Sequence, residues 1–193
     1  QKVALRHDLV CLLHEKPFAG VNGSGKHNNW SLSTDDGQNL LEPGRTPAEN
    51  EQFLIFVSAM IMAVDRHAKK LRRASENPGN VLRPGANEAP PAIISIFMGD
   101  EFTEILEGIA HGKKVANRAQ YFVQVGVDSL PQLPKDNTDR NRTSPFAFTG
   151  NKFEFRMVGS SASISGPNIV INVIAAEALD EIAARLEKAG KDI

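Results

Sequence analysis

Several features that would point to particular classes of protein are missing from this sequence. No apolar run approaches the roughly 20 residues that a helix needs to cross a bilayer, and no signal-peptide pattern is present. The formal net charge is −1, which argues against a dedicated nucleic-acid binder with a basic face. We therefore expect a cytoplasmic protein that binds neither nucleic acid nor a membrane.

Cysteine is almost absent as well. The one cysteine, Cys11, lies inside the apolar run of residues 9–13, and a short run of this kind is consistent with a buried strand. An isolated cysteine in apolar surroundings behaves as a small hydrophobic side chain. We therefore expect a buried, reduced thiol in a strand rather than a nucleophile.

The sequence also has no initiating methionine and no internal repeat. Its 193 residues are enough for one domain with a hydrophobic core. The hydrophobic fraction of 41% and the charged fraction of 23% are ordinary for a globular protein. Because a glycine-rich motif follows so soon after the first residue, we expect the sequence to be a segment of a larger chain.

Capping residues and apolar spacing predict a long helix in the first half of the chain. Thr46 is expected to cap it, with Pro47 at the first helical position and Glu49 completing a capping box. Apolar residues then recur on one face until about Arg73. The other predicted elements are a helix tail at 1–7, a turn at 35–37, a strand at 92–97, a helix at 100–109, a strand at 153–156 and a helix from 167 or 168 to 189.

The run of residues 16–31 is poor material for a hydrophobic core. Three glycines within six residues let the backbone adopt positive φ angles and approach a ligand closely. His27, Asn29 and Ser31 then alternate, so a strand would place all three on one face. A glycine turn that leads into a row of polar side chains suits a phosphate or amino-acid site with a metal ligand at its edge.

One alternative for this run is the phosphate-cradling loop of nucleotide-binding proteins. Gly20, Gly25 and Lys26 fit most of its pattern. However, His27 stands where that motif requires a hydroxyl that binds magnesium. Residues 28–31 also open no helix, although a helix N-terminus supplies half of that motif's phosphate binding. The sequence therefore favours a different kind of site.

Two further segments carry polar residues that suit a site. An irregular loop at 83–90 contains Arg83 and Glu88. A later Phe-Glu-Phe-Arg run alternates, so a strand would place Glu154 and Arg156 side by side on one face. Such a pair is either an exposed ion pair worth at most about 1 kcal/mol or a metal-binding carboxylate beside an anion-binding guanidinium. Taken alone, the run favours the ion pair.

Taken together, these segments resemble glutamine synthetase. Lys-Pro followed by Asn-Gly-Ser-Gly and His27 is similar to the family's signature, and Lys-His-Asn-Asn-Trp-Ser at 26–31 resembles its type III branch. The loop at 83–90 and the residues at 141–156 are similar to two more of its segments, in the same order. The resemblance implies an α+β fold in which residues 1–193 form part of the catalytic domain. In that domain a curved antiparallel sheet carries the site and helices pack on its outer face.

The resemblance implies ATP-dependent ligation of ammonia to L-glutamate, which gives L-glutamine through a γ-glutamyl phosphate. ATP would be a substrate and Mg²⁺ or Mn²⁺ the metal, because phosphoryl transfer depends on positioning and on neutralisation of charge. The full-length protein would be a homo-oligomer, a dodecamer of stacked hexameric rings. The family's N-terminal domain and the acidic strands that supply most metal carboxylates lie outside the sequence, so we expect the chain alone to be inactive.

The resemblance also assigns metal and nucleotide contacts to individual residues. His27 and Glu154 would hold one divalent ion, since a histidine and a carboxylate together suit Mg²⁺ or Mn²⁺ with water ligands. Asn29 and Ser31 would contact the nucleotide, and Lys152 would lie near the ATP phosphates. The sequence departs from the family pattern at two positions: Lys152 stands where related enzymes have arginine, and Asn29 where histidine is more familiar.

The remaining assignments concern glutamate and the reacting groups. Arg142 would contact ATP and neutralise the transferred phosphoryl group. Glu88 would close over the site and take a proton from the ammonia-derived nitrogen. Amide, backbone and guanidinium groups of four residues would bind glutamate: Asn22, Gly23, Arg83 and Arg156.

Two rival functions stay open from the sequence. A γ-glutamyl ligase of the same superfamily that uses another amine would need the same residues, such as Asn22, Arg83 and Glu154. A non-catalytic subdomain or regulatory binding module predicts instead that turnover in the full protein survives removal of His27 or Glu154.

Overall fold

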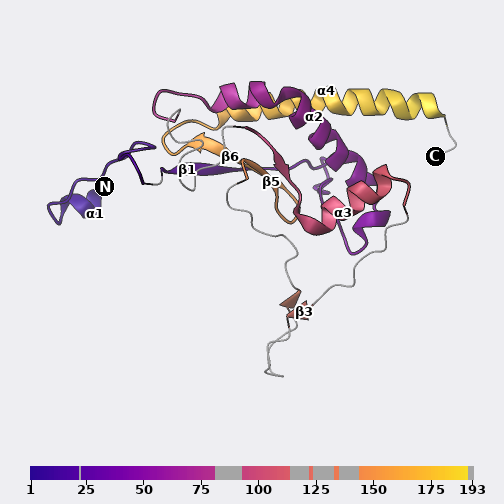
Figure 1. The fold of residues 1–193 in the computed structure, drawn as a ribbon, viewed down its shortest axis with the longest axis horizontal. Coiled ribbons are helices and arrows are strands. Elements are labelled where there is room, and N and C mark those ends of the chain that lie inside the picture. The colour runs from indigo at the N-terminus through magenta and orange to yellow at the C-terminus, as the bar shows by residue number, and fades with distance from the viewer. Residues whose placement is uncertain (22, 81–92, 114–121, 124–132, 135–143, 191–193) are drawn as a thin grey trace.

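The computed structural model describes residues 1–21, 23–80, 93–113, 122–123, 133–134 and 144–190 of the chain. Two long helices lie on one side of a small sheet, and a shorter helix lies beside the sheet (Figure 1). In chain order the elements are α1 (Lys2–Leu5), β1 (Gly25–Trp30), the 3₁₀ helix η1 (Pro47–Glu49), α2 (Glu51–Ser75), β2 (Ile96–Phe97), α3 (Gly99–Ala110), β3 (Phe122–Val123), β4 (Leu133–Pro134), β5 (Phe146–Phe148), β6 (Phe153–Gly159) and α4 (Ser165–Ala189).

The main sheet is mixed, with strand order β1-β6-β5-β2. β6 pairs antiparallel with both β1 and β5, whereas β2 pairs parallel with β5. Parallel neighbours require a crossover connection, and α3 lies within the connection between these two strands. The expected α+β fold is confirmed, but the expectation of a wholly antiparallel sheet is wrong at the β2–β5 pair. β3 and β4 form a separate antiparallel ladder.

The hydrophobic core lies between the sheet and the helices. Side chains alternate along β6, so Phe153 and Phe155 are fully buried on the face that the helices cover. Aromatic rings from three elements meet there: Phe53 of α2, Phe102 of α3 and Phe148 of β5 have ring centroids 5.3–5.8 Å apart. Such tilted and edge-on pairs add to the stabilisation that area burial alone provides.

Helices α2 and α4 pack on each other as well as on the sheet. The predicted apolar face of α2 is confirmed, since Val57, Met60 and Val64 are each no more than 1% exposed. Small residues such as Ala63 and Ala178 lie in the same core and let the two helices approach closely. The C-terminal helix begins at Ser165, two residues before the earliest start that its sequence predicted, and ends at the predicted Ala189.

The start of α2 differs from the sequence prediction. Thr46 makes no side-chain capping bond and precedes the separate 3₁₀ turn η1. Asn50 caps α2 instead, because its side chain accepts a 3.0 Å hydrogen bond from the backbone N–H of Phe53. The amide of Asn50 also donates to the carbonyls of Glu42 and Pro43. The sequence fits a capping box at Thr46, but the residue that caps the helix, Asn50, lies four positions further on.

The expected buried strand at residues 9–13 is wrong. These residues form no strand, and Leu9, Val10 and Leu13 expose 60–81% of their surface. Cys11 is half-buried in this irregular segment rather than enclosed in a strand. An apolar run indicates only that a segment needs burial, and the described residues do not supply it here.

The smaller predicted elements agree more closely. The helix expected at 100–109 is α3, and the helix tail expected at 1–7 contains α1. A turn occurs at Asp35 and Asp36, within a hairpin closed by a bridge from Ser33 to Asn39. Within the described part of the strand expected at 92–97, only Ile96 and Phe97 pair.

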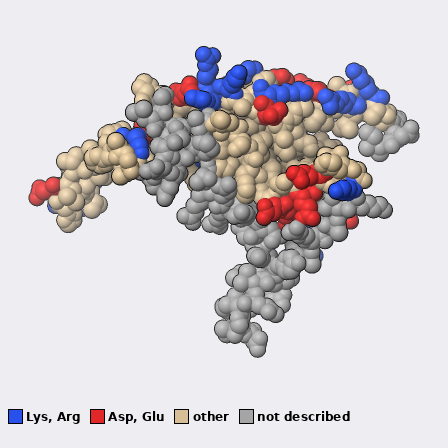
Figure 2. Space-filling model, viewed as in Figure 1, with Lys and Arg blue, Asp and Glu red and all other residues tan. Residues whose placement is uncertain are grey.

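Charged side chains gather along the helices. Figure 2 shows Lys and Arg on the side of the molecule that holds α2 and α4. The last turns of α2 carry exposed basic residues, where the negative end of the helix dipole favours them. Asp100 and Glu101 occupy the first turn of α3, where the dipole favours acids. None of the helices in the described ranges is both long and apolar enough to cross a membrane.

Candidate metal and anion site

The register of β1 against β6 brings the predicted polar residues together. Asn29 lies opposite Glu154 and Asn28 opposite Phe155, but Lys26 lies opposite Val158. One residue of β1, His27, therefore faces two residues of β6. Such a bulge bends the strand and changes the direction of its side chains. Because side chains alternate, His27, Asn29, Glu154 and Arg156 share the sheet face that the helices do not cover.

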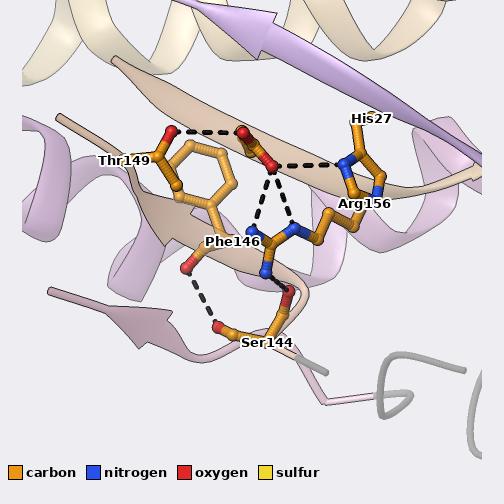
Figure 3. A network of polar contacts seen from close by, with 6 residues as sticks. His27, Ser144, Phe146, Thr149 and Arg156 are labelled. Atoms are coloured by element: carbon orange, nitrogen blue, oxygen red, sulfur yellow. Dashed lines mark hydrogen bonds and ion pairs between the residues drawn. The ribbon is translucent and has the colours of Figure 1, made fainter. Parts of the chain in front are cut away.

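The carboxylate of Glu154 contacts His27, Thr149 and Arg156, whose side chains point toward one another in Figure 3. Its Oε2 lies 3.3 Å from Nδ1 of His27, although the two residues are 127 positions apart in the sequence. The same oxygen accepts hydrogen bonds from Nε and Nη2 of Arg156, at 3.1 and 3.0 Å. The other oxygen, Oε1, accepts a 3.2 Å bond from the hydroxyl of Thr149, just after β5.

Arg156 is held from both sides. Its Nη1 donates to the carbonyl of Ser144 at 3.3 Å, and its backbone N–H donates to the carbonyl of Pro145 at 2.9 Å. The side chain is only 6% exposed, so the guanidinium is fixed within the protein. The reading of Glu154 and Arg156 as an exposed ion pair is therefore wrong.

Exposure increases across the group toward His27. The side chain of Glu154 is 17% exposed and that of His27 is 59% exposed, so a ligand can approach from the histidine end. A buried guanidinium orients the carboxylate and compensates its charge. The exposed imidazole supplies a nitrogen ligand that a metal can reach.

The donor set fits a divalent cation. Two ligands that each lie about 2.1 Å from one ion at a right angle are roughly 3 Å apart, close to the observed separation of 3.3 Å between Nδ1 and Oε2. Imidazole with carboxylate suits Mn²⁺ or Mg²⁺ when other oxygen ligands complete the shell. In the described residues no group of three or more His, Cys, Asp and Glu side chains is placed to hold a metal, so this part of the chain offers at most the two ligands His27 and Glu154.

The other predicted site residues in the described ranges lie on β1, in the loop before it and in the turn between β5 and β6. Asn29 is exposed on β1, and Ser31 is exposed just after the strand ends at Trp30. Lys152 is half-buried in the turn between β5 and β6, and Gly23 is half-buried in the loop before β1. Four predicted site residues lie outside the described ranges: Asn22, Arg83, Glu88 and Arg142.

Sequence reasoning missed the residues that support the cluster. Thr149 and Ser144 bond directly to Glu154 and Arg156, but neither forms a recognisable motif. On the opposite face, the side chains of Asn28 and Trp30 donate to two asparagines of α4, Asn168 and Asn172, each at 2.8 Å. The spacing of four residues between those asparagines beside an apolar face was a detectable signal, because it places both on one side of a helix.

The described part of the chain is thus an α+β fold that presents an imidazole, a carboxylate and a buried guanidinium on one sheet face. No family model matches the chain. The chain is 59% identical over 179 residues to a type-3 glutamine synthetase of Dictyostelium discoideum. The alignment covers 93% of the chain and 24% of that relative. It is also 57% identical over 156 residues to a glutamine synthetase of Butyrivibrio fibrisolvens. That alignment covers 80% of the chain and 22% of the relative.

A glutamine synthetase of Bacteroides fragilis is 46% identical over 191 residues, covering 97% of the chain and 26% of that relative. The chain therefore belongs to the glutamine synthetase family, in its type III branch. It spans about a quarter of the length of the curated relatives it matches.

Proposed function

We propose that this chain is part of the catalytic domain of an enzyme that ligates ammonia to L-glutamate with ATP, through a γ-glutamyl phosphate. In this reaction the γ-carboxylate of glutamate attacks the γ-phosphate of ATP and ADP leaves. Ammonia then displaces phosphate to give L-glutamine. Two findings support the proposal: the relatives named above are glutamine synthetases, and this chain brings together residues suited to such chemistry.

The contact between His27 and Glu154 is the observation that carries the proposal. The two side chains are far apart in the sequence, yet Nδ1 and Oε2 lie 3.3 Å apart on adjacent strands. A structural role alone would not require an imidazole that is 59% exposed at the open end of the cluster. A cation bound there would supply charge neutralisation to the phosphoryl groups.

The chain's own residues would hold the substrates around this pair. Arg156 would bind a carboxylate of glutamate with a side chain that is already fixed, which limits the entropy lost on binding. Asn29 and Ser31 would contact the nucleotide from β1, and Lys152 would approach the ATP phosphates from the β5–β6 turn. Outside the described ranges, four residues complete the proposed set: Asn22 and Arg83 for glutamate, Glu88 for the proton of the incoming amine, and Arg142 for the phosphoryl charge.

Several wider properties belong to the same proposal. The mixed sheet and its helices would form part of a larger curved sheet, with α2 and α4 on its outer face. The full-length enzyme would be cytoplasmic and would assemble as stacked hexameric rings. The remaining metal ligands would come from segments outside residues 1–193, so the isolated chain is expected to make no glutamine.

An activity assay on the full-length protein that carries this segment tests the proposal. Glutamine and phosphate should form in equal amounts from glutamate, ammonia and ATP. His27→Ala and Glu154→Ala should each reduce the rate by about a hundredfold or more, because each removes a proposed metal ligand. His111→Ala is the matched control, since this exposed imidazole lies at the end of α3.

A panel of amines separates the proposal from its enzymatic rival. Ammonia should support turnover, and polyamines should not replace it. Turnover with polyamines alone would identify a γ-glutamyl ligase that uses another amine. Full activity in both His27→Ala and Glu154→Ala would contradict a catalytic role for this cluster.

A further inference from the structure

A buried carboxylate, that of Glu15, is not among the groups that contact Glu154. Glu15 is only 3% exposed, although it follows the exposed segment of residues 9–13. Its Oε1 accepts hydrogen bonds from both the hydroxyl and the backbone N–H of Ser161, the latter at 3.3 Å. A carboxylate that leaves water requires such partners, so its burial calls for a physical reason.

Two glycines form the slot that holds this carboxylate. A Cβ atom at Gly79 would lie 2.6 Å from Oε2 of Glu15, and one at Gly159 would lie 2.6 Å from Oε1. Neither glycine has a positive φ in the left-handed region, so backbone conformation does not require glycine at these positions. The absence of side chains at 79 and 159 instead makes room for the two carboxylate oxygens.

The backbone of Glu15 closes the glycine-rich loop. Its carbonyl accepts a 2.7 Å hydrogen bond from the N–H of Ser24, so residues 15 and 24 meet at the base of the loop. Directly after Ser24, β1 begins at Gly25, which lies opposite Gly159 in the ladder with β6. Backbone and side chain of Glu15 therefore join the loop base to the end of β6 and to the Ser161 turn.

The turn that contains Gly79 is also tied to β6. The buried side chain of Asn80 donates to the carbonyl of Met157 at 2.7 Å and to that of Ser75 at 2.8 Å. The slot around Glu15 thus has two walls, the end of β6 and the turn after α2. A side chain seated in such a slot transmits the position of the sheet to the loop.

We propose that Glu15 is a positioning residue, whose carboxylate in the slot between Gly79 and Gly159 fixes the base of the loop of residues 16–24 and thereby the glutamate contact at Gly23. The assignment of Gly23 to glutamate rests on the proposed function. The nucleotide contacts at Asn29 and Ser31 depend on β1 instead, which Asn28 and Trp30 attach to α4. Loss of Glu15 should therefore raise the KM for glutamate and leave the KM for ATP largely unchanged.

Steady-state kinetics of the full-length protein test this separation. In Glu15→Ala the KM for glutamate should rise by about tenfold or more, while the KM for ATP stays within about twofold of the wild type. Glu15→Gln keeps an oxygen for Ser161 and should restore most of the glutamate affinity. Glu49→Ala, which removes an exposed carboxylate from η1, is the matched control. An unchanged KM for glutamate in folded Glu15→Ala would overturn the proposal.

A second experiment tests the slot without relying on activity. Gly79→Ala should lower the denaturation midpoint of the wild-type protein, because the new Cβ displaces the Glu15 carboxylate. In the Glu15→Ala background the same change should cost little, since the slot is then vacant. Equal losses in both backgrounds would overturn the placement of Glu15. A wild type that makes no glutamine would overturn the proposed function and the glutamate role, while this cycle would still decide the slot.

Discussion

The two faces of the β1–β6 pair are built from adjacent residues and have opposite properties. On one face, Phe153 and Phe155 are fully buried against the helices. On the other, Glu154 lies between them in sequence and holds a polar group that opens to solvent at His27. Strand alternation alone separates the two environments. We therefore expect the apolar face to determine stability and the polar face to determine ligand binding.

The largest effect on stability should follow from truncation on the apolar face. Phe155→Ala should lower the free energy of unfolding by about 3–5 kcal/mol, because it removes a buried ring and leaves a cavity. Ile169→Ala on α4, where the side chain is 64% exposed, should cost less than about 0.5 kcal/mol. Urea denaturation of the 193-residue chain measures both. Similar losses in the two variants would remove the distinction between the buried and exposed positions.

The next effect concerns the fixed guanidinium of the polar face. Arg156→Lys should cost about 1–3 kcal/mol of unfolding free energy, because an ammonium cannot bond Glu154 through two nitrogens and also reach the Ser144 carbonyl. In the full-length enzyme it should also raise the KM for glutamate. Arg72→Lys, at a surface pair with Glu76, is the control and should leave both quantities nearly unchanged. A neutral Arg156→Lys would mean that the forked geometry is unimportant.

A smaller effect is expected where β1 attaches to α4. Asn172→Ala leaves the indole N–H of Trp30 without its asparagine oxygen and should cost about 1 kcal/mol. In a Trp30→Phe background, which has no indole N–H, the same substitution should cost distinctly less. Denaturation midpoints of the four proteins measure the coupling, and identical costs in both backgrounds would show that this hydrogen bond contributes nothing.

The smallest effect should be the acid dependence of one helix–helix ion pair. The hydrogen bond from Arg66 on α2 lowers the pKa of Glu181 on α4 below its ordinary value of 4.5. The folded chain thus binds this proton less tightly than the unfolded chain. The pair therefore stabilises the fold above pH 4.5, and this contribution is lost as the pH falls through the lowered pKa.

Glu181→Gln removes this titrating group and should flatten that part of the acid dependence. The effect should be small, because the side chains of Arg66 and Glu181 are 41% and 32% exposed to solvent. Denaturation midpoints at about pH 7 and about pH 3 compare the two proteins. An equal loss of stability on acidification in both would show that the pair does not contribute.

Local periodicity predicted the long helices and the faces that residues 153–156 take in β6. The spacing of Val57, Met60 and Val64 marked a buried helical face, and Phe153 and Phe155 marked a buried strand face, because both signals repeat within a few residues. The pairing of β2 with β5 had no such local signal. Strand order depends on contacts between distant segments, and β2 has only two paired residues.

The sequence named His27 and Glu154 through a family motif, but it gave no register. The bulge opposite His27 decides how close the two side chains come, and a bulge depends on both strands together. Glu15 was missed for a related reason. Its role depends on Gly79 and Gly159, which are far from it in sequence and which pattern reasoning reads as ordinary turn or strand residues.

Binding of Mn²⁺ to the full-length protein tests most directly whether His27 and Glu154 hold one cation. Titrations followed by electron paramagnetic resonance would compare the wild type with His27→Ala, Glu154→Gln, the double variant and the His111→Ala control. Each single change should weaken one binding site by about tenfold or more, and the double variant should lose less than the product of the two single losses, because both ligands serve the same ion. Wild-type affinity in both single variants would contradict a shared cation at this cluster.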